Sequence, residues 1–153
     1  MRSQMEQTGV ELRTAQSSPE CRLVLPDDLG GIWPHVEPMI ARGMRHGLGD
    51  ESTPEHMRAK LLLRQLHMLV AVVGGDVMGG VVWHFRTVDL GTKIWIDMIF
   101  GERMDDWIDQ LMDAGKRVQD AVGAIAIEGS CRPGLAKRLR NHGWRTKSVV
   151  MEF

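Results

Sequence analysis

One stretch of the chain, residues 67–119, changes its hydrophobic period partway along, and this change limits the fold more than any other feature. Its first part holds three apolar runs rich in β-branched residues, which predict three strands, His67–Val73, Val77–Arg86 and Thr92–Phe100. The sequence Gly74-Gly75-Asp76 separates the first two runs. Because glycine tolerates positive φ, this junction predicts a tight antiparallel hairpin.

The third run is apolar at almost every position, which is typical of a central strand covered on both faces. If its side chains alternate strictly, one face carries Ile94, Ile96, Met98 and Phe100 and the other carries Trp95, Asp97 and Ile99. Beyond this strand the apolar residues recur with helical spacing, at Met104, Trp107, Ile108, Leu111, Met112 and Val118. The stretch therefore predicts a hairpin, a third strand and a helix that packs back on the sheet.

A strand and two helices are predicted before this unit. Cys21–Leu25 has the pattern of a short strand, and Pro26-Asp27-Asp28 has that of a helix start with an aspartate as N-cap. This helix should run to about Met44 and be kinked or broken at its two internal prolines, Pro34 and Pro38. The next helix should begin at Ser52-Thr53-Pro54-Glu55, which has the form of a capping box.

Three elements are predicted after the unit: a strand over Val122–Glu128, a short helix over Leu135–Asn141 and a closing strand over Arg145–Phe153. The predicted fold class is α/β (α+β), with one central mixed, mostly antiparallel sheet and helices on both faces. The element order is β-α-α-β-β-β-α-β-α-β. Residues 21–153 form this single domain, and residues 1–20 form a polar tail that we expect a partner to order.

Composition excludes several classes of function. The 153 residues carry a net charge of −1, so the charge balance calls for neither nucleic acid nor a membrane. No apolar run approaches the ~20 residues of a membrane helix, and the N-terminus lacks the apolar core of a secretion signal. The two cysteines, Cys21 and Cys131, are distant in sequence and fit a reduced cytoplasmic protein. The six histidines lack the spacing of a metal site, so we expect none.

The C-terminal part of the chain, residues 132–147, contains six basic residues and no acidic residue. It can be a solvated helix face, or a surface that binds a partner. The partner-binding residues would be Arg132, Lys137, Arg138 and Arg140. Nearby, Cys131 precedes a base at a helix start, a setting that can lower a thiol pKa, but no catalytic triad can be recognised in the sequence, so we interpret it as a plain cysteine without a catalytic role.

The element order and the segment Leu135–Trp144, a helix followed by Gly143 and an aromatic residue, resemble the GNAT (N-acetyltransferase) fold. The resemblance covers residues 21–153. The stretch from Gly123 to Trp144 is also similar to the GNAT-like proteins that tailed phages encode near their head and tail genes. These resemblances imply a sheet that, in the enzymes of the family, binds acetyl-CoA.

Two departures from the family pattern concern activity. The family binds the pyrophosphate of acetyl-CoA on a basic, glycine-rich loop, but the corresponding junction here reads Ile99-Phe100-Gly101-Glu102-Arg103-Met104-Asp105-Asp106. The negative charges of its three carboxylates would repel a bound diphosphate. The family's usual general acid is a tyrosine four residues before the glycine, and that position is Leu139 in a chain without tyrosine.

If the chain is nevertheless an acetyltransferase, the resemblance implies Asp97, His84 and Glu128 as its candidate bases. The pantetheine arm would lie along residues 96–99, an amine substrate would lie near residues 43–52, and the cofactor-binding residues would be Ile99, Gly101, Arg103 and Met104. Asp97 could be a buried carboxylate with a raised pKa, or a partly solvated acid at an edge; His84 could be a packed or edge histidine.

Two functions follow as hypotheses. The first is a non-catalytic GNAT-fold component of a phage virion without a cofactor, made in the cytoplasm and bound to phage head, portal or tail proteins. The second is an active acetyl-CoA-dependent N-acetyltransferase. We expect no membrane binding, because no apolar run approaches the length of a membrane helix. We also expect no nucleic-acid binding, because the basic stretch lacks an aromatic platform or a known motif.

Overall fold

The computed structural model describes residues 18–46, 52–148 and 151. Five strands form one sheet in the order β1-β2-β3-β4-β5. Within β1-β2-β3-β4 each pair of adjacent strands is antiparallel, and β5 is parallel to β4. The strands are β1 (Glu20–Val24), β2 (His67–Val73), β3 (Asp76–Val88), β4 (Gly91–Gly101) and β5 (Ala126–Gly129).

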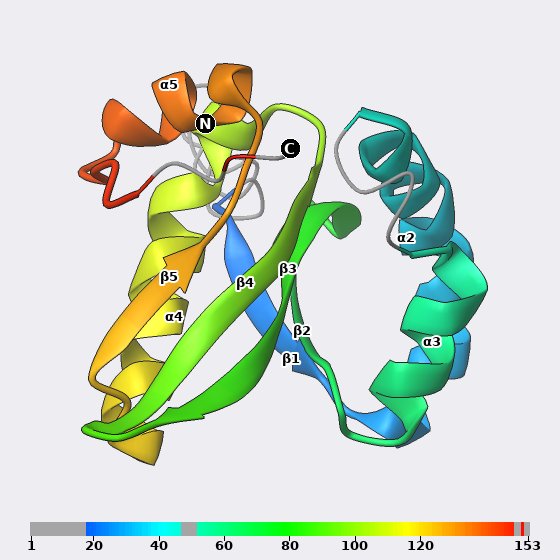
Figure 1. Cartoon of the computed structure of the whole chain (residues 1–153). Coiled ribbons are helices and arrows are strands. Elements are labelled where there is room, and N and C mark those ends of the chain that lie inside the picture. The colour runs from blue at the N-terminus through cyan, green and yellow to red at the C-terminus, as the bar shows by residue number, and fades with distance from the viewer. Residues whose placement is uncertain (1–17, 47–51, 149–150, 152–153) are drawn as a thin grey trace, which may run out of the picture.

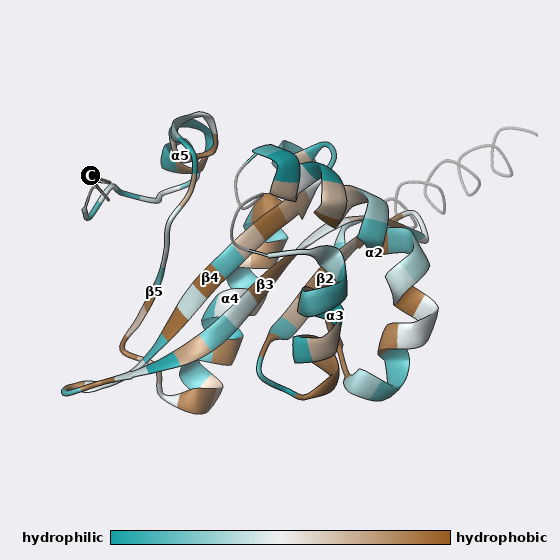
Figure 2. Cartoon of the chain, turned by 45° about the vertical axis from the view of Figure 1, so that its right-hand side comes forward, coloured by the Kyte–Doolittle hydropathy of each residue, from teal (hydrophilic) through white to brown (hydrophobic). Residues whose placement is uncertain are grey.

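Helices cover both faces of the sheet (Figure 1). One face packs on α2 (Pro26–His46) and α3 (Pro54–Leu62), and the other packs on α4 (Ile108–Val122). A short 3-10 turn, η1 (Met104–Asp106), precedes α4, and α5 (Pro133–Arg140) follows β5 at the periphery of the molecule (Figure 2). The mixed sheet and the layered helices confirm the predicted fold class.

The core consists of two apolar clusters, one on each side of the sheet. The first is centred on Val36 and Ile40 of α2 and on Met68 of β2, which are fully buried between the helices and the sheet. The second is centred on Trp107 and Ile108, which are fully buried between α4 and the strands. Apolar residues run along the central strands in Figure 2. No helix in the described ranges is long and apolar enough to cross a membrane.

A β-bulge in β4 makes the predicted alternation of this strand wrong. The register passes from Val82 opposite Met98 to Trp83 opposite Ile96, which leaves Asp97 as the extra residue. Ile94 and Ile96 therefore pack on the α4 side, whereas Met98 and Phe100 pack under α2 and α3. In a bulge, two consecutive side chains point to the same face of the strand. Every residue after the bulge therefore lies on the face opposite to the one that strict alternation predicts.

The starts of α2 and α3 differ from the prediction. The α2 helix begins at Pro26, so Asp27 and Asp28 lie in its first turn and neither is the N-cap. In α3 the cap is Thr53, whose hydroxyl accepts a hydrogen bond from the backbone N–H of His56 at 3.2 Å. Ser52 is therefore not the capping residue, and Pro54 occupies the first helical position, where its missing N–H has no consequence.

The predicted break of α2 does not occur, because the helix continues through Pro34 and Pro38 to His46. Trp33, Val36 and Ile40 on the same helix are buried in the core. Their packing offsets the backbone hydrogen bonds that the two prolines remove.

The C-terminal elements also differ. The α4 helix extends to Val122 and ends on Gly123 with a positive φ of 68°, so β5 starts only at Ala126 rather than at Val122. Residues 145–148 and Met151 form no strand, so within the described part the predicted closing strand is absent. The segment reaches β5 through a side chain instead, because Lys147 Nζ donates to Glu128 Oε1.

Candidate functional site

The junction between β4 and α4 is the position where the sequence predicted a cofactor loop. It begins at Gly101, whose φ is +125° and where an added Cβ would clash with the backbone of Met78 and Gly79 on β3. The N–H of Glu102 donates to the carbonyl of Met78 at 2.9 Å. The junction is therefore held tightly against the start of β3, in a conformation that favours glycine.

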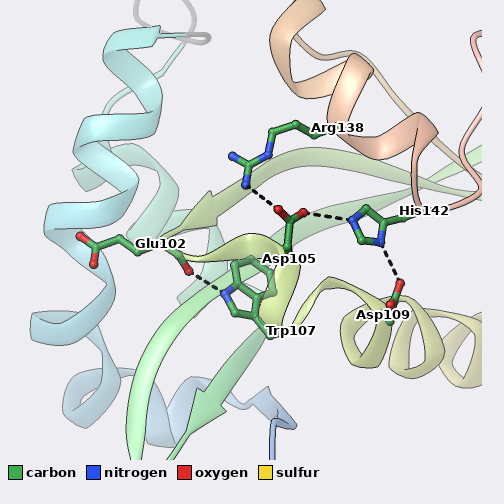
Figure 3. A network of polar contacts seen from close by, with 6 residues as sticks. All are labelled: Glu102, Asp105, Trp107, Asp109, Arg138 and His142. Atoms are coloured by element: carbon green, nitrogen blue, oxygen red, sulfur yellow. Dashed lines mark hydrogen bonds and ion pairs between the residues drawn. The ribbon is translucent and has the colours of Figure 1, made fainter.

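Trp107 fixes the turn that follows. Its side chain is fully buried, and its Nε1–H donates to the carbonyl oxygen of Glu102 at 2.7 Å (Figure 3). Arg103 adopts a left-handed conformation with φ of 52°, and the chain then forms η1 before α4 begins at Ile108. Because of this turn, α4 starts four residues later than the apolar stripe predicted.

Basic side chains of the same chain contact all three junction carboxylates. Glu102 pairs with Arg42 of α2 at 2.9 Å, and Asp106 pairs with Arg103 at 2.6 Å. Asp105 contacts two groups from the α5 region, namely His142 at 3.1 Å and Arg138 at 3.6 Å (Figure 3). The cations near the junction are thus engaged by its own carboxylates.

His142 lies between two carboxylates. Its Nε2 is 3.1 Å from Asp105 Oδ1, and its Nδ1 is 3.0 Å from Asp109 Oδ1 (Figure 3). The hydrogen bond to Asp105, and next the one to Asp109, raise the pKa of His142. Reciprocally, His142 and then Arg138 hold the pKa of Asp105 below its usual range. This arrangement joins the end of α5 to the start of α4.

The predicted cofactor residues do not fit the diphosphate of acetyl-CoA. Met104 is buried in the core, and Ile99 packs in the same cluster. Arg103 is paired with Asp106, so that of the four residues only Gly101 and Arg103 have a positive φ and the Arg103 guanidinium is already engaged. A diphosphate at the first turn of α4 would meet the carboxylates of Asp105 and Asp109, and like charges at such distances repel.

Two of the open hollows on the described part of the surface are lined by residues outside the junction. One, of about 480 Å³, lies at the β3–β4 turn beside Val88, Leu90 and Ile125. The other, of about 390 Å³, lies beside Cys21, Asp113 and Arg117. Among the described residues, no group of three His, Cys, Asp or Glu side chains is arranged to hold a metal ion.

Two of the three candidate bases are in contact. His84 Nδ1 lies 2.7 Å from Asp97 Oδ2, and both side chains are about a quarter exposed, at 29% and 25%. Arg86 donates from Nε to His84 Nε2 at 3.3 Å, and its guanidinium lies 3.7 Å from the ring centre of Trp95. Asp97 is thus partly solvated rather than deeply buried, and the β4 bulge directs it toward His84.

Glu128, the third candidate base, is engaged by two lysines. Its Oε1 accepts hydrogen bonds from Lys147 at 2.6 Å and from Lys93 at 2.8 Å, and these two contacts, Lys147 first, lower the pKa of Glu128. In the sheet Glu128 is opposite Trp95, which is opposite His84 on the next strand. Glu128 therefore lies two strands from His84, about 10 Å away at the usual strand spacing.

The predicted partner-binding surface is partly used within the chain. Arg138 contacts Asp105, and Arg140 donates to Thr146 Oγ1 at 3.1 Å. Lys137 is exposed on α5, and Arg132 is exposed at the residue before α5 begins. Burial raises the pKa of the nearby Cys131 thiol, which is opposite to the direction expected of an activated cysteine. Of the loop expected near an amine substrate, residues 43–46 belong to α2, and residues 47–51 lie outside the described residues.

Sequence reasoning missed His142, Asp109 and Arg42 as members of the junction. Asp105 and Asp109 are four residues apart, a spacing that places both on one helical face and could have indicated a shared partner. Their partner His142 is 33 residues from Asp109, and Arg42 is 60 residues from Glu102. Contacts over such separations leave no local pattern in the sequence.

No protein-family model and no curated protein sequence matches this chain. Solved structures do match, among them a ribosomal-protein-alanine N-acetyltransferase from Brucella melitensis biovar Abortus 2308, at 16% identity and a TM-score of 0.67, over 88% of this chain and 99% of that chain. An aminoglycoside acetyltransferase from an uncultured soil metagenomic sample matches at 16% identity and a TM-score of 0.66, over 89% and 97%.

A third match is a predicted acetyltransferase from Clostridium acetobutylicum, solved with acetyl-CoA. It has 11% identity and a TM-score of 0.62, over 88% of this chain and 95% of that chain. At such identities the likeness shows the fold alone, and it confirms the fold that the sequence resemblance predicted.

Proposed function

We propose that this chain, which has the GNAT fold, does not use acetyl-CoA and serves as a non-catalytic, protein-binding component of a larger assembly. The observation that carries the proposal is the β4–α4 junction, where Asp105 and Asp109 stand at the start of α4 and bind His142. A helix N-terminus favours an anion, and here side-chain carboxylates of the chain already supply that charge.

The same junction lacks free cations for a diphosphate. Arg103, Arg42 and Arg138 each pair with a junction carboxylate, at 2.6, 2.9 and 3.6 Å. A bound diphosphate would have to displace these pairs and leave the carboxylates facing its own negative charge. Two unit charges about 4 Å apart repel by about 4 kcal/mol near a protein surface, which is enough to abolish useful affinity.

Calorimetric titration with CoA and acetyl-CoA at low salt tests the proposal. Low salt maximises the chance of detecting an electrostatic interaction, because ions screen such contacts. We expect no saturable heat up to millimolar ligand, in parallel with a positive control of a GNAT enzyme in the same buffer. Micromolar binding with a stoichiometry of one would refute the proposal.

We further propose that the assembly is a phage virion and that the partners are head, portal or tail proteins. The similarity of residues 123–144 to phage GNAT-like proteins supports this proposal, as do the exposed bases Arg132 and Lys137. If it holds, gradient-purified particles of the encoding phage should contain the chain at a constant ratio to the portal protein. Absence of the chain from such particles contradicts the virion proposal.

A second candidate function is acetyl transfer, which the contact between His84 and Asp97 favours. A carboxylate on β4 and an imidazole on β3 that lie 2.7 Å apart can accept a proton from an amine. In an acetyl-transfer assay with a panel of amines, this candidate requires turnover that Asp97→Asn reduces at least about 100-fold. Turnover that Asp97→Asn leaves unchanged would remove the pair from any mechanism.

A further inference from the structure

His142 follows the end of α5 by two residues, and its ring makes a hydrogen bond through each of its nitrogens (Figure 3). The acceptors are the carboxylates of Asp105, at 3.1 Å, and Asp109, at 3.0 Å. An ionised carboxylate can only accept hydrogen bonds, so both ring nitrogens have to donate. Only the imidazolium ion has two N–H groups, and therefore this geometry requires a protonated His142.

A neutral His142 would destroy half of this arrangement. One ring nitrogen would then direct a lone pair at a carboxylate oxygen about 3 Å away, so one hydrogen bond and the ionic attraction would both be lost. The other charged group that faces this cluster is Arg138, 3.6 Å from the second oxygen of Asp105. Its guanidinium is charged at every relevant pH and contributes a constant attraction.

Apolar packing also holds the α5 segment on the body of the protein. Leu139 is buried in the apolar cluster on the α4 side of the sheet, and Leu135 and Trp144 are partly buried against the same cluster. Beyond it, Trp144 Nε1–H points at Met112 Sδ of α4 at 3.2 Å, a weak contact with a soft acceptor. The His142 ring is itself only 16% exposed. Its two charged contacts add to this apolar packing, and they are the part of the attachment that depends on the charge of the ring.

We propose that His142, Asp105 and Asp109 form a proton-dependent latch that holds α5 and Trp144 on α4 and opens when the ring loses its proton. This inference does not depend on the proposed function. The sign follows from linkage: a histidine whose pKa is raised on docking stabilises docking fully below its ordinary pKa, and this stabilisation is lost as pH rises through the docked value. Opening would also separate the basic α5 surface from the junction carboxylates.

Hydrogen–deuterium exchange from pH 5 to pH 9, corrected for intrinsic exchange rates, measures the latch in the full chain. We expect amide protection over residues 135–144 to fall about fivefold or more as pH rises, a modest factor because both carboxylates are well exposed. Protection in α4 should change less. A 5-fluorotryptophan signal assigned to Trp144 should move toward its solvent-exposed position over the same pH range.

Two variants separate the latch from general effects of pH. His142→Gln cannot carry the charge, so its α5 protection should be low and independent of pH. The matched control His35→Gln, at an exposed site on α2, should follow the wild type.

If His142→Gln unfolds, Asp109→Asn gives the test, because it removes one charged acceptor and should move the midpoint of the change in α5 protection to lower pH. Identical pH profiles for Asp109→Asn and wild type, or a wild-type α5 whose protection is independent of pH, would overturn the proposal.

Discussion

At the scale of single residues, the bulge at Asp97 has the largest effect on what the site can be. Without it, strict alternation would place Ile99 on the same face as Asp97, and the carboxylate would have mostly apolar neighbours. With it, Asp97 reaches His84 at 2.7 Å, while Ile99 packs on the α4 side. The sequence showed that both residues lie on the central strands, but their contact depends on one inserted residue that no sequence pattern marks.

Gly79 gives a prediction at the same scale. A Cβ at this position would clash with the carbonyl oxygen of Phe100 and with the ring of Trp107, neither of which can move without disrupting the junction. Gly79→Ala should therefore lower the free energy of unfolding by about 3 kcal/mol in urea denaturation.

Gly30→Ala is the matched control for this substitution. Gly30 is exposed on α2, and a Cβ there would meet nothing within 4 Å. This variant should be more stable than the wild type by up to about 1 kcal/mol, because alanine favours a helix interior. Equal destabilisation by the two substitutions would mean that the close approach of Gly79 to Trp107 is not real.

At the scale of elements, the hydrophobic period and the turn residues were sufficient to predict the five strands and four α-helices that the described residues form. Their ends were less predictable. The α4 helix starts at Ile108 because the buried Trp107 hydrogen-bonds the turn before it, and this bond depends on tertiary packing. A closing strand was predicted over residues 145–153, yet residues 145–148 form no strand and Lys147 contacts β5 through its side chain.

The start of α3 distinguishes two adjacent hydroxyl residues. Thr53 Oγ1 accepts from the N–H of His56 at 3.2 Å, whereas Ser52 makes only a long contact, 3.4 Å, to the carbonyl of Thr53. Thr53→Ala should cost about 1 kcal/mol of stability through loss of the cap. Ser52→Ala should stay within about 0.5 kcal/mol of the wild type. Thermal and urea unfolding can both rank these variants, and the reverse order would identify Ser52 as the cap.

The contact of Glu128 with Lys147 and Lys93 connects β5 to β4 and to the C-terminal segment. Because these lysines lower the pKa of Glu128 in the folded protein, its contribution to stability is present above the unfolded-state pKa and is lost as pH falls through the folded-state value. In Glu128→Gln, the free energy of unfolding should therefore depend less on pH below about pH 5. The control Glu37→Gln on α2 should keep the wild-type slope, and a slope unchanged by Glu128→Gln would contradict the pairing.

At the scale of the whole molecule, the fold and the chemistry of the junction have to be judged separately. The element order predicted the GNAT fold, because each strand and helix leaves a local pattern. Comparison of residues 99–106 with the basic, glycine-rich cofactor loop of the family also revealed the acidic junction residues Glu102, Asp105 and Asp106. Their neutralisation by Arg42 and His142 could not be predicted, because only folding brings Arg42 of α2 and His142 beyond α5 to the junction.

We propose that the ion pairs of the β4–α4 junction exclude acetyl-CoA from this GNAT fold. The most direct measurement follows the backbone amide signals of residues 101–109 by two-dimensional NMR while acetyl-CoA is added at low salt. If the ion pairs exclude the cofactor, these signals do not move at millimolar ligand. Saturable shifts centred on Gly101 and on the first turn of α4 would show instead that acetyl-CoA displaces the ion pairs and binds.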